Sequence, residues 1–95
     1  MAPRHLQVSP PRPNPFTSRT TIPFYLAKDS EVEVQIYNVL GRKLRTLHAD
    51  WLLAGDHVLE WDGRVGSGDR AASGAYVARI RAGGEELTRT LLLVR

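Results

Sequence analysis

Between residues 31 and 38, apolar and polar side chains alternate with a period of two. Val32, Val34 and Ile36 fall on one side of an extended chain, and the residues between them fall on the other side. This is the period of a β-strand with one buried face, because successive side chains of a strand point to opposite faces of the sheet. The segment therefore predicts a half-buried strand and a fold made of packed sheets.

Four further segments have similar patterns and are predicted to be strands. They are residues 20–26, 57–61, 75–82 and 85–94. Their expected inward residues are Ile22, Phe24, Leu26, Leu59, Trp61, Tyr76, Ala78 and Ile80. The last segment ends in the apolar run 91–94, which predicts either a strand covered on both faces or one whose outer face meets another surface.

Residues 43–51 are ambiguous, because Leu44 and Leu47 lie three positions apart. This spacing fits a bulged strand as well as a short helix. Turn-forming residues separate the predicted strands, among them Gly83 and Gly84 between the last two. The strands recur about every ten to twelve residues, which is typical of an all-β sandwich.

The length of the chain allows one small domain with one two-layered core, since it has 95 residues. Five of the six prolines lie within the first fifteen residues. Residues 1–13 are therefore predicted to be a proline-rich linker, in which residues 6–8 could add an edge strand. Residues 14–95 are predicted to form the domain itself.

The composition excludes several classes of function. No cysteine occurs, which excludes disulfides, thiol catalysis and cysteine-ligated zinc. No apolar stretch approaches the roughly 18 residues of a membrane span. The net charge of +3 comes from basic residues scattered along the chain, whereas nucleic-acid binders concentrate them on one face. We therefore expect no membrane span and no nucleic-acid partner.

We also expect no enzymatic activity, no cofactor and no metal site. The three histidines lack the spacing of metal ligands, and Gly66-Ser67-Gly68 lacks the Gly-x-Ser-x-Gly pattern of a serine nucleophile. Residues 62–69 form a glycine-rich loop between two predicted strands. For this loop, a calcium site formed by Asp62, Asp69 and loop carbonyls is a weaker alternative.

Six short motifs occur in a fixed order between residues 13 and 95. They are Pro13-Asn14-Pro15-Phe16, Thr20-Thr21-Ile22, Val34-Gln35-Ile36-Tyr37-Asn38-Val39-Leu40-Gly41-Arg42, Trp61-Asp62-Gly63-Arg64, Ser73-Gly74-Ala75-Tyr76 and the terminal Leu91-Leu92-Leu93-Val94-Arg95. In content and order the chain resembles the C-terminal secretion and sorting domains of the type IX secretion pathway. It is also similar to the immunoglobulin-like domain of flagellar hook-capping proteins.

The resemblance implies an immunoglobulin-like antiparallel β-sandwich of about seven strands, located at the C-terminal end of a larger secreted protein. It implies a non-catalytic role in sorting and cell-surface attachment in a Gram-negative, Bacteroidetes-like bacterium, with export through the periplasm to the medium or the cell surface. The implied partners are the outer-membrane secretion and surface-attachment machinery, with lipopolysaccharide or a polysaccharide as further candidates.

The resemblance also carries a set of candidate recognition residues. Those at the entrance of the domain are Pro13, Asn14 and Pro15. Those in the last two strands are Gly74, Tyr76, Ile80, Arg89, Leu93 and Arg95.

Two of the motifs are also predicted to have structural roles. In Trp61-Asp62-Gly63, the indole is expected to fill the core, the carboxylate to accept a turn amide, and the glycine to adopt a positive φ. Gly74 and Tyr76 are expected first to begin and pack a strand, and second to serve in recognition.

Two other functions compete with sorting. The first is a carbohydrate-binding or spacer module of an extracellular glycoside hydrolase, because Tyr25, Tyr37 and Trp51 are expected near the surface, with Tyr37 and Trp51 as the candidate sugar contacts. The second is an assembly domain like that of the hook-capping protein, which would self-associate through strand edges.

Overall fold

The computed structural model describes residues 5–95 and consists of strands joined by turns and loops. Residues 1–4, the start of the predicted linker, lie outside the described residues. The seven strands are β1 (Leu6–Val8), β2 (Thr20–Leu26), β3 (Ser30–Asn38), β4 (Lys43–Leu52), β5 (Gly55–Trp61), β6 (Gly74–Ala82) and β7 (Glu85–Leu93).

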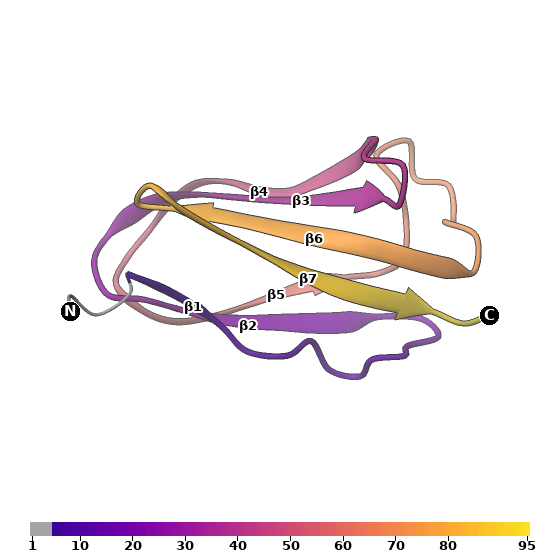
Figure 1. Cartoon of the computed structure of the whole chain (residues 1–95), viewed down its shortest axis with the longest axis horizontal. Helices are drawn as coiled ribbons and strands as arrows, with labels where there is room; N and C mark the ends of the chain where they lie inside the picture. The colour runs from indigo at the N-terminus through magenta and orange to yellow at the C-terminus, as the bar shows by residue number, and fades with distance from the viewer. Residues whose placement is uncertain (1–4) are drawn as a thin grey trace.

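The strands form two sheets that pack face to face (Figure 1). One sheet has the order β1-β2-β5 and the other β4-β3-β6-β7, and every neighbouring pair is antiparallel. The molecule is elongated along the strands, with extents of 41 × 23 × 21 Å. The predicted immunoglobulin-like antiparallel sandwich of about seven strands is confirmed. Within residues 5–95, no helix has the length and apolar character needed to cross a bilayer.

The core lies between the sheets and follows the two-residue period. Val32, Val34 and Ile36 of β3 are fully buried, and the predicted inward residues of β2 and β6 are buried as well. Leu59 is half-buried because β5 lies at the edge of its sheet. Alternation alone therefore located most of the core.

Residues 43–51 belong to a bulged strand. Val34 pairs with His48 and Gln35 with Thr46, so the partner strand has one extra residue, Leu47. A second extra residue, Leu44, lies between the partners of Ile36 and Tyr37. Each bulge changes which face the following residues occupy, so both leucines can pack against the core although they lie three positions apart.

The apolar run at the end of the chain is covered on one face only. Leu91 and Leu93 are buried, whereas Leu92 and Val94 are exposed. The prediction of a strand covered on both faces is therefore wrong for this structure. The alternative, an outer face available to another surface, remains a prediction.

The N-terminal segment connects the two sheets along one side of the sandwich. Leu6–Val8 forms β1, an edge strand paired with β2. The Glu85 carboxylate, at the start of β7, accepts the N–H of Leu6 at 2.9 Å. The Arg89 guanidinium donates to the carbonyl oxygen of Val8 at 2.7 Å. These bonds fix β1 against the edge of the opposite sheet, while the domain boundary at residue 13 stays a prediction.

The two tryptophans provide a matched test of the core. Trp61 is fully buried and Trp51 is 63% exposed. We expect Trp61→Ala to lower the free energy of unfolding by about 3–5 kcal/mol, because it leaves a large cavity. Trp51→Ala should change it by less than about 0.5 kcal/mol. Urea unfolding followed by circular dichroism measures both, and equal effects of the two substitutions would contradict this core.

Candidate functional site

Three of the sequence motifs meet around the aromatic side chain of Trp61. The ring of Phe16 lies 5.6 Å from the indole, and the ring of Tyr76 meets it edge-on at 5.2 Å. The indole N–H donates to the carbonyl oxygen of Arg64 at 2.9 Å, and the Tyr76 hydroxyl donates to the carbonyl oxygen of Ala72. The entrance segment, the glycine-rich loop and β6 therefore share one aromatic cluster.

Asn14 extends the hydrogen-bond ladder of β7 with its side chain. Its amide nitrogen donates to the carbonyl oxygen of Thr90 at 2.8 Å. Its amide oxygen accepts the N–H of Leu92, also at 2.8 Å. A side-chain amide offers one donor and one acceptor group, as a neighbouring peptide unit does. Asn14 thus satisfies a strand edge that would otherwise be open.

Phe16 continues this pairing with its backbone. Its N–H donates to the carbonyl oxygen of Leu92, and its carbonyl oxygen accepts the N–H of Val94, both at 2.9 Å. The Phe16 side chain is buried in the core. The entrance motif therefore occupies the C-terminal half of the β7 edge.

Asp62 organises the turn that follows Trp61. Its carboxylate accepts the N–H of Arg64 at 3.1 Å and a guanidinium N–H of Arg45 at 2.7 Å. Burial by itself raises the pKa of this carboxyl group, but the hydrogen bonds from Arg64 and Arg45 and the positive charge of Arg45 outweigh it. The pKa of Asp62 therefore lies below its ordinary value of 3.8.

Arg95 binds the C-terminal end of the chain to the glycine-rich loop and the segment that follows it. Its guanidinium donates to the carbonyl oxygens of Ala71 at 3.1 Å and Gly63 at 3.2 Å, and its backbone N–H donates to the Ser73 hydroxyl at 2.9 Å. Gly63 has a φ of 73°, and a Cβ there would lie 2.7 Å from an Arg95 nitrogen. Glycine is thus required both for the turn and for the approach of Arg95.

The candidate recognition residues divide into exposed and buried groups. Tyr76, Ile80 and Leu93 are buried, so their side chains pack in the core of the folded domain. Arg89 is half-buried and lies, with Ile80, toward the middle of its strand. The exposed residues, which we call the terminal surface, are Pro13, Asn14, Pro15, Gly74 and Arg95. They lie near the end of the sandwich that carries the C-terminus, because Asn14 bonds to Leu92, Gly74 pairs with Leu93, and Arg95 bonds to Ser73.

The carboxylates of the glycine-rich loop have partners within the chain. Asp62 is paired with Arg45, and Asp69 accepts the Ser67 hydroxyl at 3.0 Å. Among residues 5–95, no group of three or more histidine, aspartate or glutamate side chains is placed to hold a metal ion.

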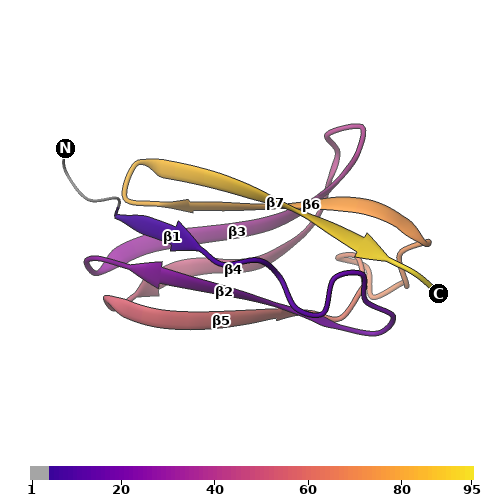
Figure 2. The same cartoon turned by 60° about the horizontal axis from the view of Figure 1, so that its bottom comes forward.

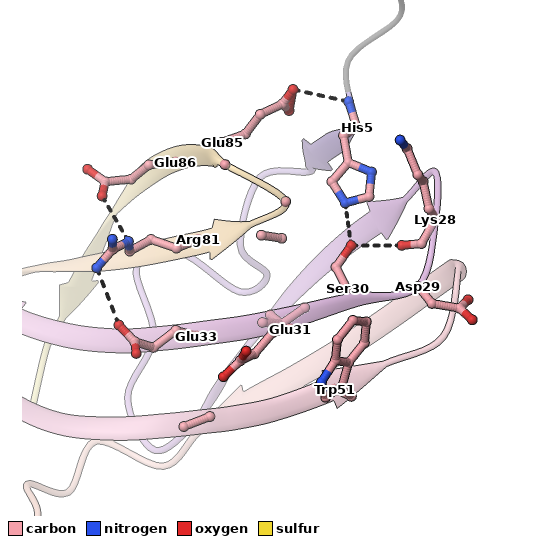
Figure 3. A pocket seen from close by; sticks show the side chains of 15 residues that line it. His5, Lys28, Asp29, Ser30, Glu31, Glu33, Trp51, Arg81, Glu85 and Glu86 are labelled. Carbon is pink, nitrogen blue, oxygen red and sulfur yellow. Dashed lines mark hydrogen bonds and ion pairs between the residues drawn. The ribbon is translucent and has the colours of Figure 1, made fainter.

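A hollow of about 720 Å³ lies at the opposite end of the sandwich, on the outer side of the four-stranded sheet (Figure 3). Trp51 forms one wall and Glu31 lies beside it, since the two residues pair across β4 and β3. Another wall is an ion-pair network in which Arg81 contacts Glu33 at 3.6 Å and Glu86 at 3.5 Å. This hollow combines an aromatic face with fixed polar groups.

The two candidate sugar contacts do not lie together. Tyr37 and Trp51 are on the same face of the four-stranded sheet, but Trp51 pairs with Glu31, six positions before Tyr37. Six residues of strand span about 20 Å. Tyr37 also lies beneath the Arg79 guanidinium, 5.1 Å from the ring centre. Trp51 is therefore the candidate that faces the hollow.

The two antiparallel sheets and their order define an immunoglobulin-like domain. The profile of the FlgD Ig-like domain matches residues 15–86, and the chain belongs to that family. Among solved structures it is similar to part of the crystal structure of dimeric latent PorU from Porphyromonas gingivalis, with a TM-score of 0.76 and 22% sequence identity. That match covers 99% of this chain and 10% of the PorU chain, and it concerns the fold alone. No curated protein gave a significant match.

The lowered pKa of Asp62 predicts an acid-dependent contribution to stability. Because the folded pKa lies below the unfolded one, the ionised group stabilises the domain above the unfolded pKa, and this stabilisation is lost as the pH falls through the folded pKa, below 3.8. We expect wild type to be more stable than Asp62→Asn near neutral pH, and the two to converge in strong acid.

Urea unfolding across this pH range measures the difference. Asp56→Asn, which changes an exposed carboxylate on β5, is the matched control and should show no comparable convergence. A difference between wild type and Asp62→Asn that is independent of pH would show that the charge of Asp62 does not stabilise the turn.

Proposed function

We propose that this chain is a non-catalytic sorting and cell-surface attachment module of a larger secreted protein, recognised by a type IX-like outer-membrane secretion apparatus. The observation that carries the proposal is the position of Pro13-Asn14-Pro15, Gly74 and Arg95 near one end of the sandwich, exposed to solvent, although they span most of the chain. In this proposal the protein reaches the medium or the cell surface through the periplasm of a Gram-negative bacterium.

The rigidity of the terminal surface supports a role in recognition. Asn14 and Arg95 are each held by hydrogen bonds to backbone atoms of distant segments. A partner that binds a surface already fixed in the free protein loses less conformational entropy on binding. Because Asn14 and Phe16 occupy half of the β7 edge, the apparatus would recognise side chains of the folded domain instead of adding a strand there.

A non-catalytic role agrees with the chemistry of the carboxylates. Glu33 and Glu86 are paired with Arg81 on an open sheet face, and Asp62 is paired with Arg45. The pKa of Asp62 is shifted downward, opposite to the shift that a general acid requires. The FlgD Ig-like family and the fold likeness to part of PorU also support an accessory or assembly domain.

A fusion experiment tests the sorting role. We expect a periplasm-targeted reporter carrying this chain at its C-terminus to reach the surface or medium of a type IX-competent bacterium. It should stay in the periplasm of a mutant without the outer-membrane translocon. Retention of the reporter in the competent cell, with the domain folded as judged by protease resistance, would argue against sorting.

Paired arginine variants then test the terminal surface. Arg95→Ala removes an exposed guanidinium from that surface, and Arg81→Ala removes one from the opposite end. We expect a severalfold loss of surface reporter for the first variant and little change for the second. Thermal unfolding of each purified domain separates lost recognition from lost folding.

Carbohydrate binding is a second candidate function, favoured by the position of Trp51. Its ring is 63% exposed and borders the hollow, where Glu31 and Arg81 offer an acceptor and donors for hydroxyl groups. An apolar ring face combined with a few placed polar groups is typical of small-molecule sites.

Binding to soluble and insoluble polysaccharides, measured by calorimetry and sedimentation, tests this second function. We expect Trp51→Ala to weaken any binding at least tenfold. Tyr25→Ala, which removes an exposed ring from the other sheet, should leave it unchanged. Binding that survives the loss of Trp51 would exclude the hollow as the sugar site.

A further inference from the structure

Two aliphatic side chains at the turn between β3 and β4 are mostly exposed to solvent. Val39 is 71% exposed and Leu40 is 89% exposed. Figure 2 shows this turn projecting beyond the body of the sandwich. Single exposed aliphatic residues are common, but two adjacent ones at a protruding turn form an apolar tip.

The turn is held in one conformation by Asn38. Its side-chain oxygen accepts the N–H of Leu40 and of Arg42, each at 3.0 Å. Its carbonyl oxygen accepts the N–H of Gly41 at 3.0 Å, and Gly41 has a φ of 84°. The apolar tip is therefore presented in fixed form, and this costs little further ordering on binding.

Two basic residues lie next to the apolar tip in the turn. Arg42 and Lys43 follow it after Gly41 and are exposed, and residues 38–48 contain no acidic residue. The glycine-rich loop lies alongside, because the N–H of Gly66 donates to the carbonyl oxygen of Leu44 at 2.9 Å. Arg64 in this loop is exposed, and its guanidinium donates to the carbonyl oxygen of Gly68 at 2.8 Å. The nearby carboxylate of Asp62 is already paired with Arg45.

The end of the sandwich opposite the apolar tip carries an excess of negative charge. The hollow there is lined by five acidic residues and two basic ones. The acidic residues are Asp29, Glu31, Glu33, Glu85 and Glu86. The scattered basic residues of the sequence are thus sorted by the fold, with an apolar, cationic tip at one end and excess carboxylate at the other.

We propose that the tip of Val39 and Leu40, with Arg42 and Lys43, docks on an anionic lipid surface. The aliphatic side chains enter the boundary between headgroups and acyl chains, and the two cations pair with lipid phosphates. This proposal is independent of the sorting function, because it involves none of the terminal surface.

Size and shape favour a lipid surface over a protein partner. Specific protein interfaces bury about 800 Å² on each partner, whereas this tip consists of two aliphatic residues on a convex turn. A fluid headgroup layer closes around a convex tip without a matching groove. A free phosphate ion satisfies the cations but leaves Val39 and Leu40 in water.

Single-site labelling tests the proposal on the full chain. Because the chain contains no cysteine, Leu40→Cys and Val58→Cys each provide one thiol for an environment-sensitive dye. Val58 is an exposed aliphatic residue on the other sheet. With vesicles of phosphatidylcholine containing about 30% phosphatidylglycerol, we expect a blue shift at position 40 and none at position 58. Pure phosphatidylcholine vesicles and inorganic phosphate should give little shift.

Unlabelled variants measured by vesicle sedimentation test each component. We expect Val39→Ser with Leu40→Ser, and separately Arg42→Gln with Lys43→Gln, to weaken binding by about tenfold or more. Val58→Ser and Lys28→Gln make single changes of the same kinds away from the tip and should bind like wild type. Higher salt should weaken binding through screening.

The proposal is overturned by absence of binding to anionic vesicles, by equal binding to neutral ones, or by tip variants that bind like wild type. A dye response to inorganic phosphate alone would indicate a free-anion site instead. All changed side chains are exposed, and unchanged thermal unfolding confirms that each variant is folded.

Discussion

The packing of Phe16, Trp61 and Tyr76 is the interaction on which the rest of the structure depends. Phe16 brings the entrance segment to the edge of β7, and Trp61 holds the start of the glycine-rich loop through the carbonyl of Arg64. Arg95 then rests on that loop. Removing the indole would therefore loosen three segments that are distant in sequence, and with them the surface proposed for recognition.

Both edge strands of the four-stranded sheet, β4 and β7, have features that hinder pairing with a further strand. Side chains and backbone of the entrance segment cover half of the β7 edge, and β4 has bulges at Leu44 and Leu47. Covered edges and bulges prevent a second chain from adding to a sheet. An assembly role like that of hook-capping proteins would therefore need contacts other than simple extension of this sheet.

Alternation along the chain predicted most of the strands and the core of β3, because these depend on local spacing. Turn chemistry predicted the roles of Asp62 and Gly63 after Trp61. Alternation could not choose between helix and strand for residues 43–51, since a bulge is defined only by the partner strand. Nor could it find the bonds of Asn14 and Glu85, which join residues more than seventy positions apart. The separation of Tyr37 from Trp51 likewise depends on the register between β3 and β4.

The separation of acidic and basic groups along the 41 Å axis gives the domain an electric dipole. A dipolar body that approaches a charged boundary experiences a torque before it makes contact. The fraction of collisions that begin in one orientation then rises, and the rate of encounter falls as ionic strength increases. The charge separation set by the fold thus affects both the rate at which this domain encounters a charged boundary and its orientation at the encounter.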